Sequence, residues 1–482
     1  MTSADVATVR QERAAGIGLM PGWLWFGIAV YAALLSNGTL MLGDSDTYWH
    51  IVVGKWILAH GAVPHADIYS FTKTGEPWIS SSWLAQVLFA AAYECAGWAG
   101  PIVLAASSVA IAFAVFACIL GSRMPAKYAI SIALAALLLS ASHLFARPHV
   151  LVLPVMIAWV NGLLRASEQR EPPSLWLLPL LALWANLHGG FVFGLVLVAP
   201  FALDALWNAE QPRRMRLALR WALFGAAALA ACCATPYGWD SILASRRILD
   251  LGELLHLIYE WMPVNFGYFG PFEACLLAAI AAALYCGVRL TPSRIILVLG
   301  LLHMALSHVR NVEIFALLAP LVVLTPLASQ FAFEPARSAR LALPLVAGLA
   351  AIVAASTVAF AATHRFEAPA TQAPAAALDV LKQRNAKRIL NDLPFAGYFI
   401  SKGIPVFVDG RAELYGEAFV MAYYRAMQLK DVNVLLDLLK RYDIDATVLA
   451  PQTPAVTFLD HANGWQRVHA DSHAVVHMRT AN

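Results

Sequence analysis

The sequence has little charge, and this limits what the chain can be. Of its 482 residues only 13% are Asp, Glu, Lys or Arg, whereas 60% are hydrophobic. It has no basic run of the kind that binds nucleic acid, and a net charge of +3 gives no electrostatic reason for such a partner. A soluble chain of this length cannot bury so much apolar surface, so we expect lipid to be its solvent.

Cysteine and the common binding motifs are also scarce. The six cysteines show no zinc-type spacing, and most fall within or beside apolar runs, where they are best interpreted as small core residues. The sequence has no phosphate-cradling glycine loop and no internal repeat. These absences argue against a zinc module, a nucleotide-binding domain of the usual kinds and a repeat protein.

Long apolar runs are abundant, and each approaches the ~20 residues that cross a bilayer. The predicted spans are 22–42, 100–120, 128–146, 149–164, 174–188, 190–207, 217–235, 271–288, 294–308, 312–328 and 341–362. With residues 1–21 as a cytoplasmic segment, the inner breaks carry most of the loop lysines and arginines, as the positive-inside rule requires. The pair of spans joined at "NLHGG" fits a re-entrant hairpin as well as two crossings.

The composition changes after the last span. Residues 363–482 begin with an Ala/Pro-rich linker and then alternate two patterns. Segments 376–385 and 432–443 predict amphipathic helices, and 406–410, 446–450 and 474–478 predict short buried strands. The predicted fold is therefore a polytopic α-helical membrane protein with about 11 transmembrane helices over 22–362, followed by a small α/β domain on the outer side.

The loop after the first span, residues 43–99, is called the first loop below and is predicted to lie outside. It begins with Asp44 and Asp46, and 46–60 predicts a helix along the interface with Trp49 and Trp56 at headgroup depth. Asp44 either caps this helix or takes part in chemistry. Asp46 either complements the helix dipole or acts as a base that the dipole keeps ionised.

Other predicted outer breaks bring ionisable groups to the same side of the membrane. Ionisable groups near lipid are expensive, so they usually line a cavity or pair with one another. The alternative is that these arginines only reach up to lipid headgroups. Glu260 is interpreted as an ordinary loop end. The candidate residues in these breaks are Arg147, His149, His188, Arg246, Arg247, His308 and Arg310.

The first loop resembles that of the GT-C superfamily of membrane glycosyltransferases, and most closely the protein O-mannosyltransferases and the lipid A aminoarabinose transferase. In those families an Asp after the first span precedes a helix that ends in Gly, and a Gly-x-Pro turn then leads to the second span. The residues that match in order are Asp46, His50, Gly61, Pro64, Gly75, Pro77 and Trp78. An acid usually follows the family's Asp, whereas Thr47 stands here and Asp44 supplies an Asp-x-Asp instead.

The resemblance implies transfer of a sugar from a polyprenyl-phosphate donor to a glycan, lipid or protein acceptor at the outer face of a bacterial inner membrane. Asp46 takes the position of the catalytic carboxylate, with Asp44 as its partner or as ligand of a divalent metal, whose presence stays open. The expected phosphate ligands are Arg310, Arg147, Arg246 and Arg247, and the expected substrate-orienting residues are His50, His149, His188 and His308.

Two other functions also fit the sequence. Polar breaks such as "NLHGG" suit a lipid or solute transporter or flippase. The segment 406–416, "VFVDGRAELYG", suits a non-catalytic membrane scaffold whose periplasmic domain binds a partner, although Asp409 and Glu413 there also fit as local caps. The resemblance gives no role to Asp409, Arg411 or Tyr415.

Overall fold

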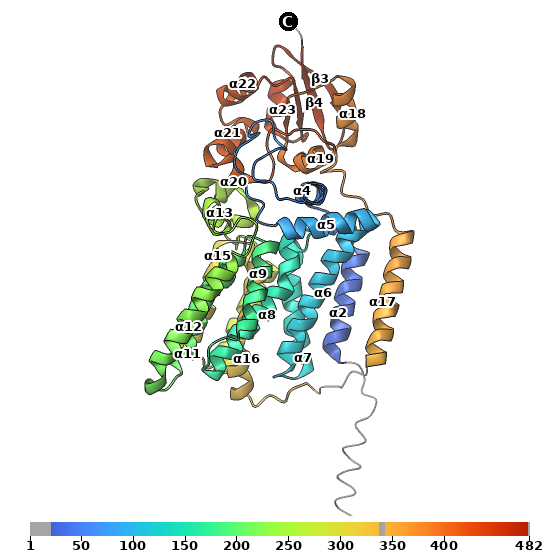
Figure 1. The fold of residues 1–482 in the computed structure, drawn as a ribbon. Coiled ribbons are helices and arrows are strands. Elements are labelled where there is room, and N and C mark those ends of the chain that lie inside the picture. Colours follow the sequence, from blue (N-terminus) through green and yellow to red (C-terminus); the bar gives the residue numbers. More distant parts are fainter. Residues whose placement is uncertain (1–20, 337–342, 481–482) are drawn as a thin grey trace, which may run out of the picture.

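The computed structural model describes residues 21–336 and 343–480, and these form three layers (Figure 1). A layer of long helices lies at one end, two helices of the first loop lie across it, and a domain with a β-sheet covers those two helices. Residues 1–20 of the predicted cytoplasmic segment lie outside the described residues, as do the inner-side Arg337 and Arg340.

The helical layer contains most of the apolar residues of the chain. Six helices of the described residues are long and apolar enough to cross a membrane, and six further apolar helices are shorter. The helices of this layer are α2 (Gly22–Ser36), α3 (Gly38–Met41), α6 (Ala99–Gly121), α7 (Ala126–Ser140), α8 (Pro148–Gln169), α9 (Leu178–Leu187), α10 (Phe191–Val196), α11 (Val198–Trp207), α12 (Gln211–Cys232), α14 (Pro271–Tyr285), α15 (Pro292–Ser307), α16 (Asn311–Gln330) and α17 (Leu343–Thr363).

Each predicted span contains one or two of these apolar helices, and how many of them cross a membrane stays a prediction. The break at "NLHGG" is real, because α9 stops where His188 adopts an extended backbone and α10 begins at Phe191. Short helical turns, η1 (Ala141–His143) and η2 (Leu175–Leu177), extend two of the predicted ranges. The loop between α12 and α14 holds α13 (Asp240–Leu249), η3 (Gly252–Leu257) and η4 (Tyr259–Trp261).

The first loop folds into two helices that lie on the helical layer (Figure 1). The predicted helix 46–60 is confirmed as α4 (Asp46–His60), which ends at Gly61 with a positive φ of 61°. It packs against α5 (Trp83–Ala96) at Gly54, where an added Cβ would overlap the Gln86 carbonyl. The close approach of the two helices therefore requires glycine at this position.

Residues 363–480 form the sheet domain. Its sheet has the order β1-β2-β4-β3, with β1 (Ile389–Asn391) parallel to β2 (Ala446–Leu449), and with β3 (Trp465–Ala470) and β2 both antiparallel to β4 (Val475–Arg479). The predicted strands at 446–450 and 474–478 and the two predicted helices are present. The helices and helical turns are α18 (Ala375–Gln383), η5 (Leu393–Phe395), α19 (Ala396–Ser401), α20 (Ala412–Tyr415), α21 (Glu417–Met427), α22 (Val432–Arg441) and α23 (Pro454–Leu459).

The strand predicted at 406–410 is wrong. The segment is buried, but its backbone bridge is to the first loop, and it hydrogen-bonds to the sheet through the side chain of Asn391 in β1. Val406 donates its N–H to Tyr69, and Phe71 donates back to Val406, at 3.1 Å in both cases. A hydrophobic run indicates that a segment is buried but not which segment it packs against. Here that segment is the first loop, more than 300 residues earlier in the sequence.

Apolar packing also joins the first loop to the sheet domain. One buried cluster contains Tyr48, Trp49 and Val53 of α4 together with Phe395 and Phe399 of the sheet domain. A separate cluster fills the interior of the helical layer. The sheet domain is thus built on α4, and its position relative to Asp46 is set by a shared core.

Candidate functional site

Asp44 and Asp46 occupy the start of α4. The backbone N–H of Asp46 donates to Asp44 Oδ1 at 2.8 Å, so Asp44 stabilises the helix start. The indole Nε1 of Trp49 donates to Asp46 Oδ1 at 2.9 Å. The other oxygens of the two carboxylates, both Oδ2, face Arg147.

Arg147 lies between the two aspartates and a third acid. Its Nη1 donates to Asp44 Oδ2 at 2.8 Å and to Glu260 Oε1 at 2.9 Å, and its Nη2 lies 3.2 Å from Asp46 Oδ2. Arg147 precedes Pro148, the first residue of α8, and the proline holds it in an extended conformation with φ −122° and ψ 160°. We call Asp44, Asp46, Arg147 and Glu260 the acid–arginine cluster.

Glu260 is the residue that sequence reasoning missed, and its interpretation as an ordinary loop end was wrong. It reaches the cluster because η4 is tied to the break between α15 and α16. Arg310 donates its backbone N–H to the Glu260 carbonyl, and Val309 donates to that of Met262, both at 3.0 Å. The only signal in the sequence was its position between Tyr259 and Trp261, in a loop expected on the same side.

The Arg310 side chain lies beside this cluster. Its guanidinium carbon sits 4.6 Å from the ring centre of Trp261, and the described residues place no carboxylate in ion-pair contact with it. His308 contacts the Trp261 carbonyl through Nδ1 at 2.7 Å. Arg310 is thus a held guanidinium whose hydrogen-bonding capacity is not used by an acid.

Burial and charge separate the acids of the cluster. Burial and the neighbouring Asp44 charge raise the pKa of Asp46 to about 7, although Arg147 opposes the shift. Burial alone would raise the pKa of Glu260, but the Arg147 and Arg310 guanidiniums lower it to about 2. Asp46 is therefore the acid that exchanges a proton near neutral pH, and Glu260 stays ionised.

The candidate histidines divide into two groups. His50 is buried on α4, where its Nδ1 lies 3.1 Å from Gln86 Nε2, and burial lowers its pKa well below the usual value. His149 contacts the His143 carbonyl through Nε2 at 2.6 Å, and its ring centre lies 6.5 Å from that of His188. These three rings lie near Arg147, whereas His308 lies at Trp261.

Arg246 and Arg247 are not brought to the cluster. Both are exposed on α13, and Arg246 pairs with Asp250 one turn later at 3.8 Å. The prediction that they bind phosphate with Arg147 finds no support in this arrangement. An amphipathic helix in a loop carries arginines on its solvent face for solubility, and sequence alone does not distinguish that face from a ligand-binding one.

The residues present do not fit a divalent metal. Asp44 and Asp46 direct oxygens at Arg147, so a guanidinium fills the space between them. Within residues 21–336 and 343–480 no group of His, Cys, Asp and Glu has the arrangement of a metal site. An oxygen-ligand site needs about six donors, and we derive no step through a metal.

Comparison with solved structures gives a likeness in fold. No protein-family model matches the chain, and no curated protein matches it in sequence. The archaeal oligosaccharyltransferase AglB from Archaeoglobus fulgidus, solved with an inhibitory peptide and a dolichol-phosphate, superposes with a TM-score of 0.52 at 11% identity. The alignment covers 88% of this chain and 70% of that protein.

The chain has the fold of this oligosaccharyltransferase. The likeness extends over most of the chain and supports the broad expectation of a GT-C-like fold. The narrower resemblance to protein O-mannosyltransferases stays a prediction. At 11% identity the likeness concerns the fold and assigns no role to individual residues.

Proposed function

We propose that this chain is a membrane glycosyltransferase that moves a sugar from a polyprenyl-phosphate donor to an acceptor hydroxyl, with Asp46 as the general base. The observation that carries the proposal is the acid–arginine cluster, in which Asp46 shares Arg147 with Asp44 and Glu260. That AglB, which has the same fold, is an oligosaccharyltransferase solved with a dolichol-phosphate supports this class of donor.

Asp46 has the properties that a general base needs. Its Oδ1 is held by Trp49 at 2.9 Å, its side chain keeps 16% exposure, and a pKa of about 7 matches the proton affinity of the base to neutral pH. In the proposed step Asp46 takes the proton of the acceptor hydroxyl, while the oxygen of that hydroxyl forms a bond to the anomeric carbon of the sugar. The bond from that carbon to the phosphate oxygen breaks, and the lipid phosphate leaves with the electron pair.

The leaving phosphate needs a cation, and Arg310 suits this role better than Arg147. Arg147 already meets Asp44, Asp46 and Glu260, so its hydrogen bonds are committed. Arg310 is held on the face of Trp261 beside the cluster, and among the described residues no carboxylate lies within ion-pair distance of its guanidinium, although Glu260 and Glu313 are near enough to interact with its charge. A guanidinium so placed stabilises the charge that develops on the phosphate oxygens.

The negative charge of the cluster has a second use. The transition state of glycosyl transfer resembles an oxocarbenium ion, which nearby carboxylates stabilise. Glu260 supplies this charge in the ionised form, since Arg147 and Arg310 lower its pKa to about 2. In the proposed arrangement the cluster lies at the outer face of a bacterial inner membrane, with the sheet domain in the periplasm.

The test uses the full chain in detergent with a panel of radiolabelled farnesyl-phosphate sugars and a membrane lipid extract as acceptor. Asp46→Asn should reduce sugar transfer by roughly 10²–10⁴-fold, the usual contribution of a general base. The matched control is Asp240→Asn, which changes another acid at the start of an exposed helix and should leave transfer unchanged. Unimpaired transfer by Asp46→Asn would exclude its role as base.

The same panel separates the alternatives predicted from the sequence. A transporter would move the intact prenyl-phosphate sugar across a vesicle membrane without releasing prenyl phosphate. A scaffold would do neither, and its cellular function would survive the Asp46→Asn change. Either result in place of sugar transfer would contradict the proposed function.

A further inference from the structure

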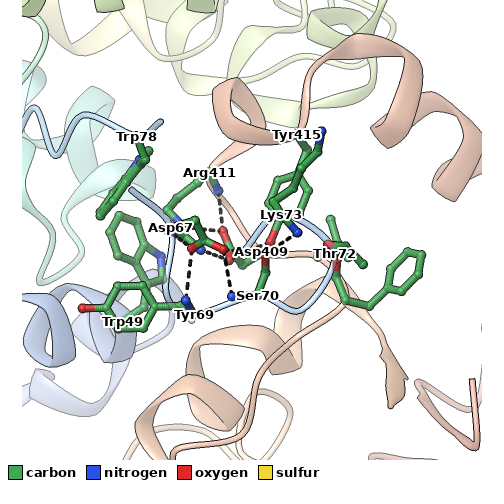
Figure 2. A network of polar contacts seen from close by, with 12 residues as sticks. Trp49, Asp67, Tyr69, Ser70, Thr72, Lys73, Trp78, Asp409, Arg411 and Tyr415 are labelled. Carbon is green, nitrogen blue, oxygen red and sulfur yellow. Dashed lines mark hydrogen bonds and ion pairs between the residues drawn. The ribbon is translucent and has the colours of Figure 1, made fainter. Parts of the chain in front are cut away.

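A buried arginine joins the first loop to the sheet domain. Arg411 Nη1 lies 2.7 Å from Asp67 Oδ1 of the first loop, and Arg411 Nε and Nη2 donate to the two oxygens of Asp409 at 2.9 and 2.6 Å. Arg411 and Asp409 are each 2% exposed and Asp67 is fully buried. Tyr415 donates its hydroxyl to Asp409 Oδ2 at 2.9 Å. Figure 2 shows this network, which we call the interlayer clamp: Asp67, Asp409, Arg411 and Tyr415.

Burying such charges costs free energy, and a well-packed apolar replacement is often as stable. The clamp therefore calls for a reason besides stability, and its geometry suggests one. Its bidentate hydrogen bonds join Arg411 to Asp409 and so hold the turn between them in one conformation. The ion pair between Arg411 Nη1 and Asp67 then fixes this turn relative to the first loop. The turn between these two residues contains Gly410, and Gly410 lies against Asp46.

The contact at Gly410 is as close as the backbone allows. A Cβ added to Gly410 would overlap Asp46 Oδ1 and lie 3.0 Å from Asp46 Cγ. Only glycine lets the turn lie this close to the carboxylate. The sheet domain thus forms one wall around the candidate base, and Arg147 contacts the same carboxylate at Oδ2.

Aromatic rings make a second connection between the clamp and Asp46. The guanidinium carbon of Arg411 lies 4.7 Å from the ring centre of Trp78, and Trp78 meets Trp49 edge to face at 6.2 Å. Trp49 is the residue that donates to Asp46 Oδ1. Arg411 is therefore connected to the Trp49 indole through Trp78 (Figure 2), and to Gly410 through the turn that it closes with Asp409.

We propose that the Asp409–Arg411 turn is a positioning element by which the sheet domain fixes the orientation and the solvent exposure of the Asp46 carboxylate. The proposal rests on the proposed function, in which Asp46 is the base. Arg411 is a positioning residue, since its ion pairs are with Asp67 and Asp409 and it acts on Asp46 only through other residues. The sheet domain then belongs to the reaction centre and is not only an appended binding module.

The test compares Arg411→Lys with Arg479→Lys, an arginine-to-lysine change at an exposed ion pair of the same domain. Lysine keeps the charge and loses the bidentate fork. Arg411→Lys should lower kcat roughly tenfold to a hundredfold at unchanged KM for the farnesyl-phosphate sugar, because the base is misplaced and the donor site is not. Arg479→Lys should match the unaltered chain.

A second readout needs no substrate. Dicyclohexylcarbodiimide modifies protonated carboxyl groups, so labelling of the Asp46 peptide, followed by mass spectrometry, reports its protonation against pH. The groups that face Asp46 are Asp44, Arg147 and Asp409, and the unaltered chain should label with a midpoint near the pKa of about 7. Gly410→Ala pushes the turn away and admits water, so its midpoint should move down. Gly300→Ala, where an added Cβ meets nothing within 4 Å, is the control.

The two readouts distinguish failure of this proposal from failure of the proposed function. Should no sugar be transferred while Gly410→Ala and Arg411→Lys still lower the labelling midpoint, the positioning stands and the enzyme assignment falls. Should transfer occur with kcat and the midpoint unchanged in a folded Arg411→Lys chain, the positioning is overturned. If Arg411→Lys does not fold, Tyr415→Phe, which removes only the hydroxyl bond to Asp409, serves as the deciding variant.

Discussion

Replacing Arg147 by glutamine should destabilise the protein in a pH-dependent way. Among residues 21–336 and 343–480, Arg147 is the one cation in ion-pair contact with Asp44, Asp46 and Glu260. Removing one partner of a buried ion pair costs about 3–5 kcal/mol, because an uncompensated charge is left behind. The four side chains keep between 16 and 28% exposure, so water offsets part of this cost and we expect about 3 kcal/mol.

The sign of the pH dependence follows from the carboxylates. Without Arg147 nothing offsets the burial that holds the folded-state pKa of Asp46 above its unfolded value near 4. Such groups cost no stability below the unfolded pKa, and the cost grows as pH rises through the folded pKa. For Asp46 that pKa is already about 7 in the unaltered protein and rises further in the variant. The loss should therefore be larger at pH 8 than at pH 5.

The assay is thermal unfolding of the full chain in detergent at pH 8 and pH 5, followed by tryptophan fluorescence. The control is Arg123→Gln, because Arg123 is 42% exposed in its pair with Glu168 and should cost less than about 1 kcal/mol. Adding Asp44→Asn to Arg147→Gln should restore part of the stability. The reasoning about the cluster is refuted if Arg147→Gln and Arg123→Gln unfold at the same temperature at pH 8. It is also refuted if Arg147→Gln loses the same stability at pH 8 and at pH 5.

Three further predictions concern the proposed reaction. The transfer rate should rise with pH and level off above about 7, because Asp46 must be ionised to accept a proton; a flat profile between pH 6 and 8 would contradict this. Trp49→Phe removes the donor to Asp46 Oδ1, a bond to an ionised group worth about 1.5–3 kcal/mol, and should move that midpoint up by roughly one unit or more. Arg310→Lys should weaken binding of farnesyl phosphate in a calorimetric titration, whereas Arg246→Lys should not, since Arg246 is exposed and paired with Asp250; equal effects of the two changes would remove Arg310 from the donor site.

The sequence by itself determined the local features. The apolar runs predicted where the helices lie, because in a chain that is 60% hydrophobic the spacing of apolar residues follows the surface that each helix buries. The acid pair before an amphipathic stretch placed the start of α4 at Asp46. The charge asymmetry of the breaks predicted which loops share a side, and that prediction led to Arg147 and Arg310.

The partners of these residues were decided only by the tertiary structure. Glu260 and Arg147 meet across 113 residues of sequence, and Arg411 meets Asp67 across an even longer separation. The segment 406–410 was apolar enough for a strand, yet its Val406 backbone pairs with Tyr69 and Phe71 of the first loop. The sequence around Gly410 did not indicate its role, because that role depends on the Asp46 carboxylate that lies against its Cα. The local sequence pattern indicates which residues are buried, whereas the residues that they contact depend on how distant segments of the chain pack together.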